Sequence, residues 1–428
     1  MSPVQISFRS SCQIIDLQLI TCYIKEIFLK TKLFAFIFLL SLLVTACSAA
    51  DWPGFRGQAT DGISTEKLIN TYWNTKPPKL VWKTELTDSS YSGPSVVGNK
   101  VFILDHLGEE DIVRCYDFTT GKEIWKTAYP NPGDPTFGHT RATPTVSKGK
   151  VVTISWRGLV VCLDAKTGKQ IWTRDTMKDY PGPLSGWGHG GSALIDGNKV
   201  IIIPGGKDSS VIALDLATGK TIWAGGGSDP TGYTTPVKAQ IQGVWQYVVV
   251  SASCFKGVDV KSGKLLWKYD FATNANIASP IVVGNSVFVT AQYNKGGVMV
   301  DIAPDFSVKL RWENKAILAH FNTPIYLNGF IYGTSDAGGT LVCQDATDGS
   351  TKWTAPGFEK GPVLAVGGYL MVLAGDSGQL ALVKPDPRKY LEIGRFTPLG
   401  GQSWAAPVFS NGHMVIRNLT TLACFDMR

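Results

Sequence analysis

Imidazole, indole and guanidinium side chains recur just before one class of short apolar segment in this sequence. Three of the five histidines fall at this position, as do arginine, tyrosine, amides and two tryptophans. A second set of aromatic and basic residues follows the next apolar segment. Such groups, converging on one concavity, would suit a planar or anionic ligand. The candidate ligand-binding residues are His139, Arg141, Trp156, Arg157, Trp187, His189, Tyr233, Asn276, His320, Asn322, Gln402 and Trp404.

These residue types form no recognisable catalytic motif. The sequence contains no Gly-rich phosphate loop, no Ser-His-Asp order and no Cys-x-x-Cys pair. His139, His189 and His320 could hold a metal only if their loops met, which the sequence does not establish. We therefore predict no metal site and assign no catalytic residue. A second interpretation stays open, in which the polar side chains simply satisfy the backbone of their own loops.

The composition is that of a large globular chain. Of the 428 residues, 44% are hydrophobic and 18% are charged, so a sizeable core can form. The net charge of +7 arises from acids and bases that are mixed along the chain without a long basic run. We therefore do not expect nucleic acid as a partner.

Seven of the 13 tryptophans recur at intervals of 41 to 51 residues. Most of them end the phrase Asp-x-x-Thr-Gly-x-x-x-Trp, as in Asp117 to Trp125. We expect the aspartate to accept backbone N–H groups across a turn and the glycine to supply a positive φ. The tryptophan would pack against the neighbouring repeat. These residues are interpreted as structural, and the seven tryptophans are Trp82, Trp125, Trp172, Trp223, Trp267, Trp312 and Trp353.

A second phrase occurs in eight copies. It consists of a small residue, usually followed by proline, and then an apolar run that is split by a Gly or Asn turn. Each repeat thus holds four short strands, A to D, which is typical of a β-propeller. The last copy stops at Asp426 without a strand D, whereas residues 78–86 look like a strand D with no blade before them. We predict an all-β, eight-bladed propeller over residues 77–428, with four antiparallel strands per blade and a ring closed by this N-terminal strand.

Propeller geometry sorts the loops onto two faces. The A–B and C–D turns are short and similar, and they share one face. The B–C and D–A loops vary between repeats and share the other face. We expect any function to lie on this variable face, around the central funnel, where the candidate ligand-binding residues fall.

The N-terminus contains a targeting signal. Residues 33–46 form an uncharged apolar run after several lysines, which is too short to span a membrane but typical of a signal peptide. Residues 44–47, Val-Thr-Ala-Cys, resemble a bacterial lipobox with Cys47 as the lipidated residue. Ordinary cleavage after Ala50, or a retained membrane anchor, are the alternatives. We predict a signal peptide with an upstream extension over residues 1–46 and a leader over residues 47–76.

The repeated phrase resembles the tryptophan docking motif of the pyrroloquinoline-quinone-like propeller repeat family. The resemblance covers residues 77–428, and the opening Asp51 to Gly57 is similar to that of a group of exported propellers within the family. The family also includes quinone-dependent alcohol and sugar dehydrogenases and lipoprotein scaffolds of the outer-membrane β-barrel assembly machinery. The resemblance therefore implies the fold more strongly than the activity.

The cysteines and acids bear on which branch applies. Cys115, Cys162, Cys343 and Cys424 share one position in different blades, so we expect separations beyond disulfide reach. No two cysteines are adjacent, so the vicinal disulfide of many quinone alcohol dehydrogenases is missing. A quinone enzyme would need calcium ligands and a catalytic aspartate. Asp336 and Asp376 could be considered for these roles, but no matching motif surrounds either of them.

These observations lead to one main hypothesis and one alternative. The chain is expected to be an exported, lipid-anchored monomer in the periplasm, held at the outer membrane. It would act as a non-catalytic binding or scaffold protein and take a protein partner or a small anionic or planar ligand at its funnel face. The alternative is an oxidoreductase that uses pyrroloquinoline quinone (PQQ) with calcium.

Overall fold

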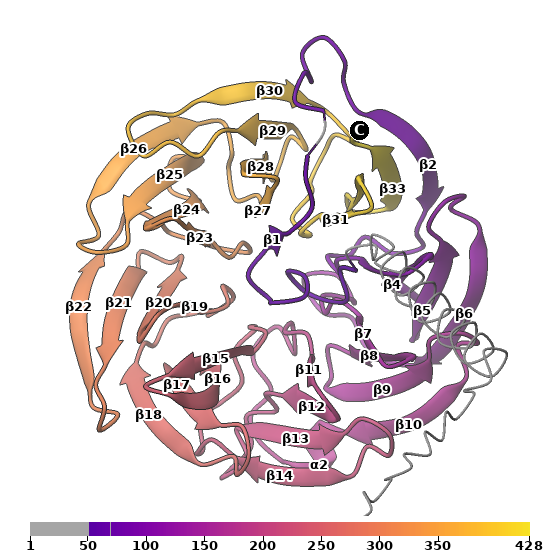
Figure 1. The fold of residues 1–428 in the computed structure, drawn as a ribbon. Helices are drawn as coiled ribbons and strands as arrows, with labels where there is room; N and C mark the ends of the chain where they lie inside the picture. Colours follow the sequence, from indigo (N-terminus) through magenta and orange to yellow (C-terminus); the bar gives the residue numbers. More distant parts are fainter. Residues whose placement is uncertain (1–50, 69) are drawn as a thin grey trace, which may run out of the picture. The chain divides into compact units, whose positions relative to one another are not determined.

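A computed structural model describes residues 51–68 and 70–428. In this part, 32 strands form eight four-stranded antiparallel blades arranged in a ring, which confirms the predicted fold (Figure 1). The predicted signal peptide and Cys47 lie outside the described residues. No helix in the described part is long and apolar enough to cross a membrane.

The first four blades run in chain order from the inner strand A to the outer strand D. One short helix, α2 (Thr176–Asp179), follows the second blade. The strands are β3 (Ser95–Val97), β4 (Lys100–Leu107), β5 (Glu110–Asp117) and β6 (Glu123–Pro130) in blade 1; β7 (Thr145–Ser147), β8 (Lys150–Ile154), β9 (Leu159–Asp164) and β10 (Gln170–Asp175) in blade 2; β11 (Leu194–Asp196), β12 (Lys199–Ile202), β13 (Val211–Asp215) and β14 (Thr221–Gly225) in blade 3; and β15 (Val237–Ile241), β16 (Val244–Val250), β17 (Cys254–Asp259) and β18 (Leu265–Asp270) in blade 4.

The last four blades repeat this order, except that blade 8 takes its outer strand from the start of the chain. The strands are β19 (Ile281–Val283), β20 (Ser286–Ala291), β21 (Gly296–Ile302) and β22 (Val308–Asn314) in blade 5; β23 (Ile325–Leu327), β24 (Phe330–Ser335), β25 (Thr340–Asp345) and β26 (Thr351–Pro356) in blade 6; β27 (Val363–Val366), β28 (Tyr369–Leu373), β29 (Leu380–Val383) and β30 (Glu392–Phe396) in blade 7; and β31 (Val408–Ser410), β32 (His413–Arg417), β33 (Thr421–Asp426) and β2 (Lys79–Glu85) in blade 8.

The tryptophan motif joins most blades to the next, with an indole N–H bond to the following blade at Trp82, Trp125, Trp172, Trp312 and Trp353. Asp117 Oδ1 accepts the backbone N–H groups of Thr119 and Thr120, so the carboxylate holds the C–D turn of blade 1. Trp82 of blade 8 lies over this turn, and its indole N–H donates to the Phe118 carbonyl at 2.8 Å. Gly121 has φ +69°, and a Cβ there would lie 2.6 Å from the Trp82 ring. The motif therefore requires glycine for both conformation and space.

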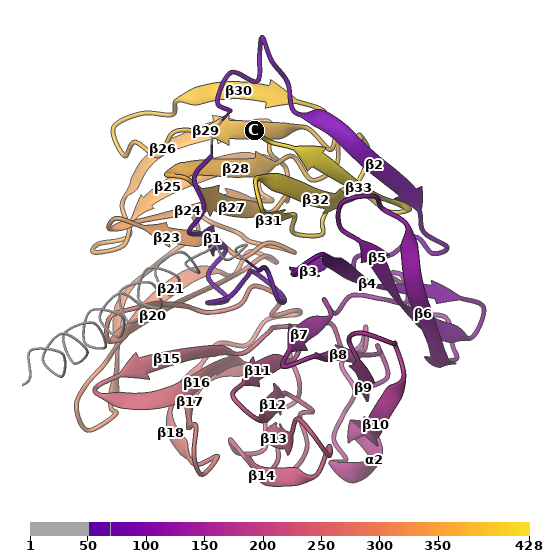
Figure 2. The same ribbon diagram turned by 45° about the vertical axis from the view of Figure 1, so that its right-hand side comes forward.

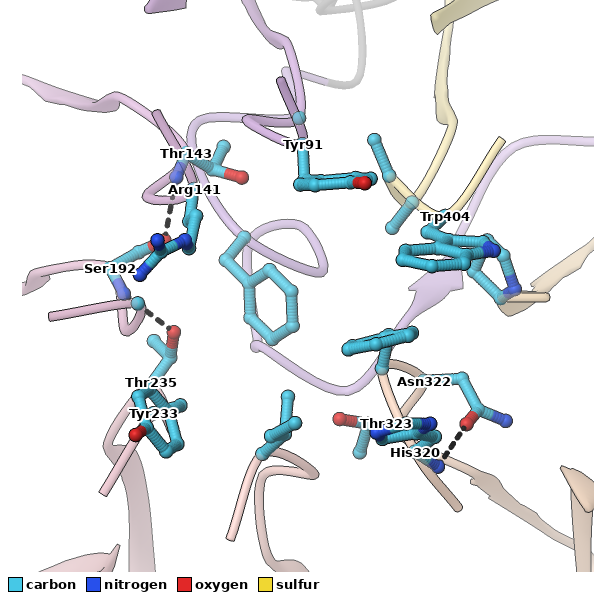
Figure 3. Close-up of a pocket in the computed structure, with 18 of the residues that line it drawn as sticks. Tyr91, Arg141, Thr143, Ser192, Tyr233, Thr235, His320, Asn322, Thr323 and Trp404 are labelled. Atoms are coloured by element: carbon cyan, nitrogen blue, oxygen red, sulfur yellow. Dashed lines mark hydrogen bonds between the residues drawn. The ribbon is translucent and has the colours of Figure 1, made fainter. Parts of the chain in front are cut away.

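The small residue at the start of strand A has a second linking role. The Thr143 N–H donates to Ser192 Oγ at 2.8 Å, and the Ser192 N–H donates to Thr235 Oγ1 at 3.0 Å. The same bond continues from Thr235 to Ser279 and from Ser279 to Thr323. A hydroxyl at this position thus links blades 2 to 6 around the inner edge of the ring (Figure 3).

The N-terminal strand closes the ring as predicted. β2 pairs antiparallel with β33, with Trp82 opposite Cys424, and completes blade 8. Two segments that are far apart in the sequence therefore share one sheet, and β33 is paired on both sides.

The leader packs on the ring, a point that the sequence left open. Trp52 bridges to Val96 in blade 1, and the Val146 N–H of blade 2 donates to Pro53 O. The leader then crosses the ring, and β1 (Ile63–Ser64) pairs parallel with β27 of blade 7 (Figures 1 and 2). Glu66 accepts the N–H groups of the Asn411–Gly412 turn in blade 8. The boundary between leader and propeller at residues 76 and 77 remains a prediction.

The described cysteines behave as small core residues. Cys115, Cys162, Cys254, Cys343 and Cys424 are all free and buried. Burial raises the pKa of the Cys115 thiol to about 12, so it is not a reactive thiolate at neutral pH.

Candidate functional site

A cavity of about 260 Å³ lies at the centre of the ring. Each of the eight D–A loops places at least one side chain in its wall, as the geometry of the sequence repeats suggested. The leader contributes Phe55 and Arg56 to the same lining. The D–A loop residues that line the cavity include Tyr91, Phe137, Arg141, Trp187, Tyr233, Ile277, His320, Phe321, Lys360 and Trp404 (Figure 3).

Stacked rings form one wall. Trp404 stacks on Phe321 with ring centroids 4.2 Å apart and on Tyr91 with centroids 5.0 Å apart. Phe321 in turn stacks on His320 at 3.9 Å. The Lys360 ammonium lies 5.0 Å from the Trp404 ring centroid, within range of a cation–π interaction. This wall is therefore an aromatic surface that carries one positive charge.

A second aromatic group comes from blades 1 to 3. Trp187 contacts Phe137 edge to face at 5.8 Å between centroids, and it contacts Tyr233 at 5.6 Å. The Arg141 guanidinium lies among these rings and donates to the carbonyls of Phe137, Gly138 and Trp187. Figure 3 shows Arg141 and Tyr233 on one side of the cavity and Trp404 and His320 on the other.

The charged side chains of the lining are all basic. Within the described residues, Arg56, Arg141 and Lys360 line the cavity, but no aspartate or glutamate does. Burial lowers the pKa of Arg141, although an arginine remains protonated at neutral pH. Its donors meet only backbone carbonyls, and it makes no ion pair in the described part of the chain. A positive charge without an acid partner favours an anionic group in the cavity.

His320 completes this side of the cavity. Its Nδ1 lies 3.3 Å from Asp336 Oδ2, and the Tyr293 hydroxyl is 3.2 Å from its Nε2. Burial lowers the pKa of His320, although the Asp336 carboxylate acts in the opposite direction. The ring is therefore mainly neutral at pH 7 and serves as an aromatic and hydrogen-bonding group.

The structure brings half of the twelve predicted site residues together at the cavity. The other six do not line it, and their side chains serve the surrounding loops. The six lining residues are Arg141, Trp187, Tyr233, His320, Asn322 and Trp404. The six that do not line it are His139, Trp156, Arg157, His189, Asn276 and Gln402.

Local contacts explain most of these exceptions. Asn276 Nδ2 donates to the carbonyls of Ser251 and Phe271, so its amide ties two loops together. Trp156 packs beneath Gly133 and Gly188 of the long D–A loops, and Arg157 lies beside its ring. For Asn276 and Arg157 the alternative interpretation, polar groups that satisfy their own loops, is the better description, whereas the Trp156 ring fills the space under the loops and its indole N–H has no partner within the described residues. Gln402 is half-buried in the loop before β31 and does not reach the cavity.

His139 belongs to a separate polar cluster in blade 1. Its ring stacks on His106 with centroids 3.7 Å apart, and its Nδ1 lies 3.2 Å from Asp88. His106 Nδ1 is 2.8 Å from Asp111 Oδ1, and this hydrogen bond raises the pKa of His106 against the effect of burial. These contacts hold the imidazole away from the cavity.

His189 gives a testable pH dependence. Burial lowers the pKa of its imidazole from 6.5 to about 4. The unfolded chain binds this proton below about pH 6.5 and the folded chain does not. This difference does not affect the free energy of unfolding above about pH 6.5. As the pH drops from 6.5 toward 4, it lowers the free energy of unfolding by up to about 3 kcal/mol. Urea denaturation over this range should show a smaller loss for His189→Gln than for the wild type. Parallel losses would contradict this assignment.

The three histidines once considered as a metal site have separate environments. His139 contacts Asp88, His189 is buried against Met177, and His320 contacts Asp336. Across residues 51–68 and 70–428, no group of three His, Cys, Asp or Glu side chains has the geometry to hold a metal ion.

The residues also do not fit PQQ and its calcium ion. Asp376 Oδ1 accepts the Trp404 indole N–H at 3.1 Å, and Asp336 lies 3.8 Å from the Lys360 ammonium. A calcium ion bound to Asp336 would stand beside that positive charge. The chain's own Phe321 and Tyr91 rings already stack on Trp404, the surface that a planar cofactor would use.

Comparison with known proteins identifies the family. The family model described as outer membrane protein assembly factor BamB matches residues 108–355, more than half of the chain. The chain belongs to this family. The predicted resemblance to the PQQ-like propeller repeats is thereby confirmed.

Individual relatives agree with the BamB assignment. Outer membrane protein assembly factor BamB of Burkholderia pseudomallei is 26% identical over 336 residues, which cover 74% of this chain and 78% of the relative. The crystal structure of BamB from Moraxella catarrhalis matches with a TM-score of 0.58 and 16% identity, over 82% of this chain and 97% of that chain. Quinohemoprotein alcohol dehydrogenase from Comamonas testosteroni matches with a TM-score of 0.64 and 15% identity, over 90% and 82%. At such identities the solved structures indicate a shared fold alone.

Proposed function

We propose that this chain is a non-catalytic scaffold that binds a protein partner of outer-membrane assembly through its funnel face. Membership of the BamB family supports the assembly role. The main support for a binding site is the central cavity, which is lined by all eight D–A loops, mainly with aromatic and basic side chains. Aromatic side chains and arginine are the residues that dominate binding energy at protein interfaces.

The cavity also indicates the chemistry of the bound group. Aromatic walls favour an apolar or aromatic side chain, and the uncompensated Arg141 favours a carboxylate close to it. A partner loop that carries an acidic residue beside an aromatic one would satisfy both. The basic lining also suits a small anion close to Arg141, whereas a planar ring would find Trp404 already covered by Phe321 and Tyr91.

Site-specific photo-cross-linking in the native host tests the binding face. A photoreactive phenylalanine analogue at Phe137, which is 41% exposed and lines the cavity, should cross-link to an outer-membrane assembly protein. The matched control is Trp245, which is 50% exposed and begins the second strand of blade 4, next to the A–B turn. The same cross-link at Trp245 and none at Phe137 would overturn the proposal.

The proposed location rests on the lipobox at Cys47. We propose that the chain is exported and held to the outer membrane by a lipid on this residue, as a monomer. Cys47→Ala should release the chain from the membrane fraction to the soluble periplasmic fraction, because one thioether-linked lipid group supplies the anchoring. Fractionation followed by immunoblotting measures this. Retention of the variant in the membrane would contradict the lipobox assignment.

A further inference from the structure

The face opposite the cavity carries an uneven distribution of lysines. The A–B and C–D turns of blades 1 to 4 hold ten of them, of which seven are exposed and three are half-buried. The corresponding turns of blades 5 to 8 hold fewer: their A–B turns are built around residues such as Asn285, Asn328 and Gly367, and their lysines lie in the C–D turn of blade 7, at Lys384 and Lys389. We name the first set the lysine rim, and it consists of Lys100, Lys122, Lys148, Lys150, Lys166, Lys169, Lys199, Lys220, Lys261 and Lys264.

Contacts between the turns show that the lysine rim is one continuous surface. Lys148 Nζ donates to Asn198 Oδ1 in the next A–B turn at 2.6 Å. Lys199 Nζ donates to the Val260 carbonyl at the start of the next C–D turn, also at 2.6 Å. Neighbouring turns from different blades therefore meet along this edge of the ring.

The positive charge of the rim is only partly offset by neighbouring acids. No lysine of the rim forms an ion pair within the described part of the chain; the nearby pair of Lys238 with Asp196 involves none of them. The same C–D turns contain Asp117, Asp164, Asp215 and Asp259, whose charges offset part of that of the ten lysines and leave the rim positive overall. The rim thus presents a field that suits an anionic surface.

The leader brings the proposed membrane anchor to this same edge. Asp51 Oδ1 accepts the Gly98 N–H at 2.8 Å in the A–B turn of blade 1. Trp52 is 4% exposed and paired with Val96, so the chain is fixed to blade 1 from this point. Only four peptide steps separate Cys47 from Asp51, a reach of at most about 15 Å. A lipid on Cys47 would therefore hold the A–B turn of blade 1 close to the bilayer.

We infer that the lysine rim lies on the anionic headgroups of the membrane that holds the lipid anchor, so that the cavity opens away from that membrane. This inference rests on the proposed lipidation of Cys47. Clustered lysines next to a lipid anchor are attracted to anionic headgroups and would therefore fix the orientation of the anchored chain. The partner would then approach the funnel face from the aqueous side.

Quenching by lipid-bound quenchers tests this orientation. The full lipidated chain is placed in vesicles of phosphatidylethanolamine and phosphatidylglycerol whose headgroups carry a quencher. A fluorophore is attached at Lys166→Cys on the rim or at Arg157→Cys in the B–C loop of blade 2, both exposed and both losing one positive charge. The described native cysteines are buried and should not be labelled. We expect several-fold stronger quenching at position 166, and equal or reversed quenching would overturn the inference.

Vesicle flotation separates this test from the proposed lipid anchor. A wild-type chain that does not float with the vesicles would refute the anchor. A chain that floats with the rim label unquenched would refute only the orientation.

Charge reversal tests the role of the lysines themselves. In the Cys47→Ala background, which removes the lipid, Lys122→Glu with Lys220→Glu should weaken binding to phosphatidylglycerol vesicles by about tenfold or more. The matched control is Lys83→Glu with Lys126→Glu, where both lysines are exposed on the outer strands β2 and β6. The control should bind like its parent. Equal weakening in both pairs, or none in the rim pair, would overturn the inference.

Discussion

Trp82→Ala should lower the free energy of unfolding by about 3–5 kcal/mol, the usual cost of removing a large buried aromatic side chain. Trp82 is 7% exposed, and it donates to Phe118 O and covers Gly121 of the next blade. It also stands on β2, the strand that closes the ring. Its removal therefore weakens both the contact between blades 8 and 1 and the pairing that completes blade 8.

Chemical denaturation measures this effect, because the free energy of unfolding in water is the midpoint denaturant concentration multiplied by the m-value. Trp245→Ala is the matched control, because this ring is 50% exposed and should change the stability by less than about 0.5 kcal/mol. Trp82→Phe keeps the ring but loses the indole N–H, so it should fall between alanine and the wild type. Equal losses for Trp82→Ala and Trp245→Ala would contradict the role assigned to the tryptophan repeat.

Arg56→Ala should also lower the stability, by at least about 3 kcal/mol. The Arg56 guanidinium is buried and donates to Thr323 O at 2.6 Å, Pro324 O at 2.8 Å and Asp61 O at 2.6 Å. Burial lowers the pKa of this arginine to about 10, so it still carries its charge at pH 7. Alanine would leave these carbonyls without a partner, and each lost bond to a charged donor costs about 1.5–3 kcal/mol.

Two measurements check the Arg56 prediction. Denaturation should show the loss, and limited proteolysis should cut the leader faster in Arg56→Ala than in the wild type, because its link to blade 6 is gone. Arg388→Ala is the control, since that side chain is 85% exposed and its pair with Asp386 is worth about 0–1 kcal/mol. A leader that stays protected in Arg56→Ala would show that Arg56 does not hold it.

The repeated elements of this molecule could be predicted from the sequence because the residues that each element requires occur at the same position in several repeats. The Asp117-type turn, the glycine under five of the seven tryptophans and the strand at residues 79–85 all occur where the repeat period places them. A single copy would have been ambiguous. Eight copies with a missing last strand at one end and an extra strand at the other fix the closure of the ring.

The site was predicted less completely because its residues occur once each. The position before strand A pointed to Arg141, His320 and Trp404, and all three line the cavity. It could not distinguish a side chain that enters the cavity from one such as Asn276, which turns back to its own loop. Phe321 lies between two predicted residues and was missed, although its neighbours could have pointed to it. Phe55 and Arg56 belong to a segment without periodicity, so no pattern placed them at the centre of the ring.

The pairing of β2 with β33 also sets the order in which the molecule can assemble. β2 is among the first segments to be synthesised, but its only neighbour in the sheet is the last strand of the described chain. The leader likewise bonds to blades 6, 7 and 8 through Arg56, β1 and Glu66. Such long-range closure is slow, because the chain loses conformational entropy when its distant segments come together, before their contacts can stabilise the structure. β2 must therefore wait for β33, and until the two strands meet blade 8 lacks its outer strand.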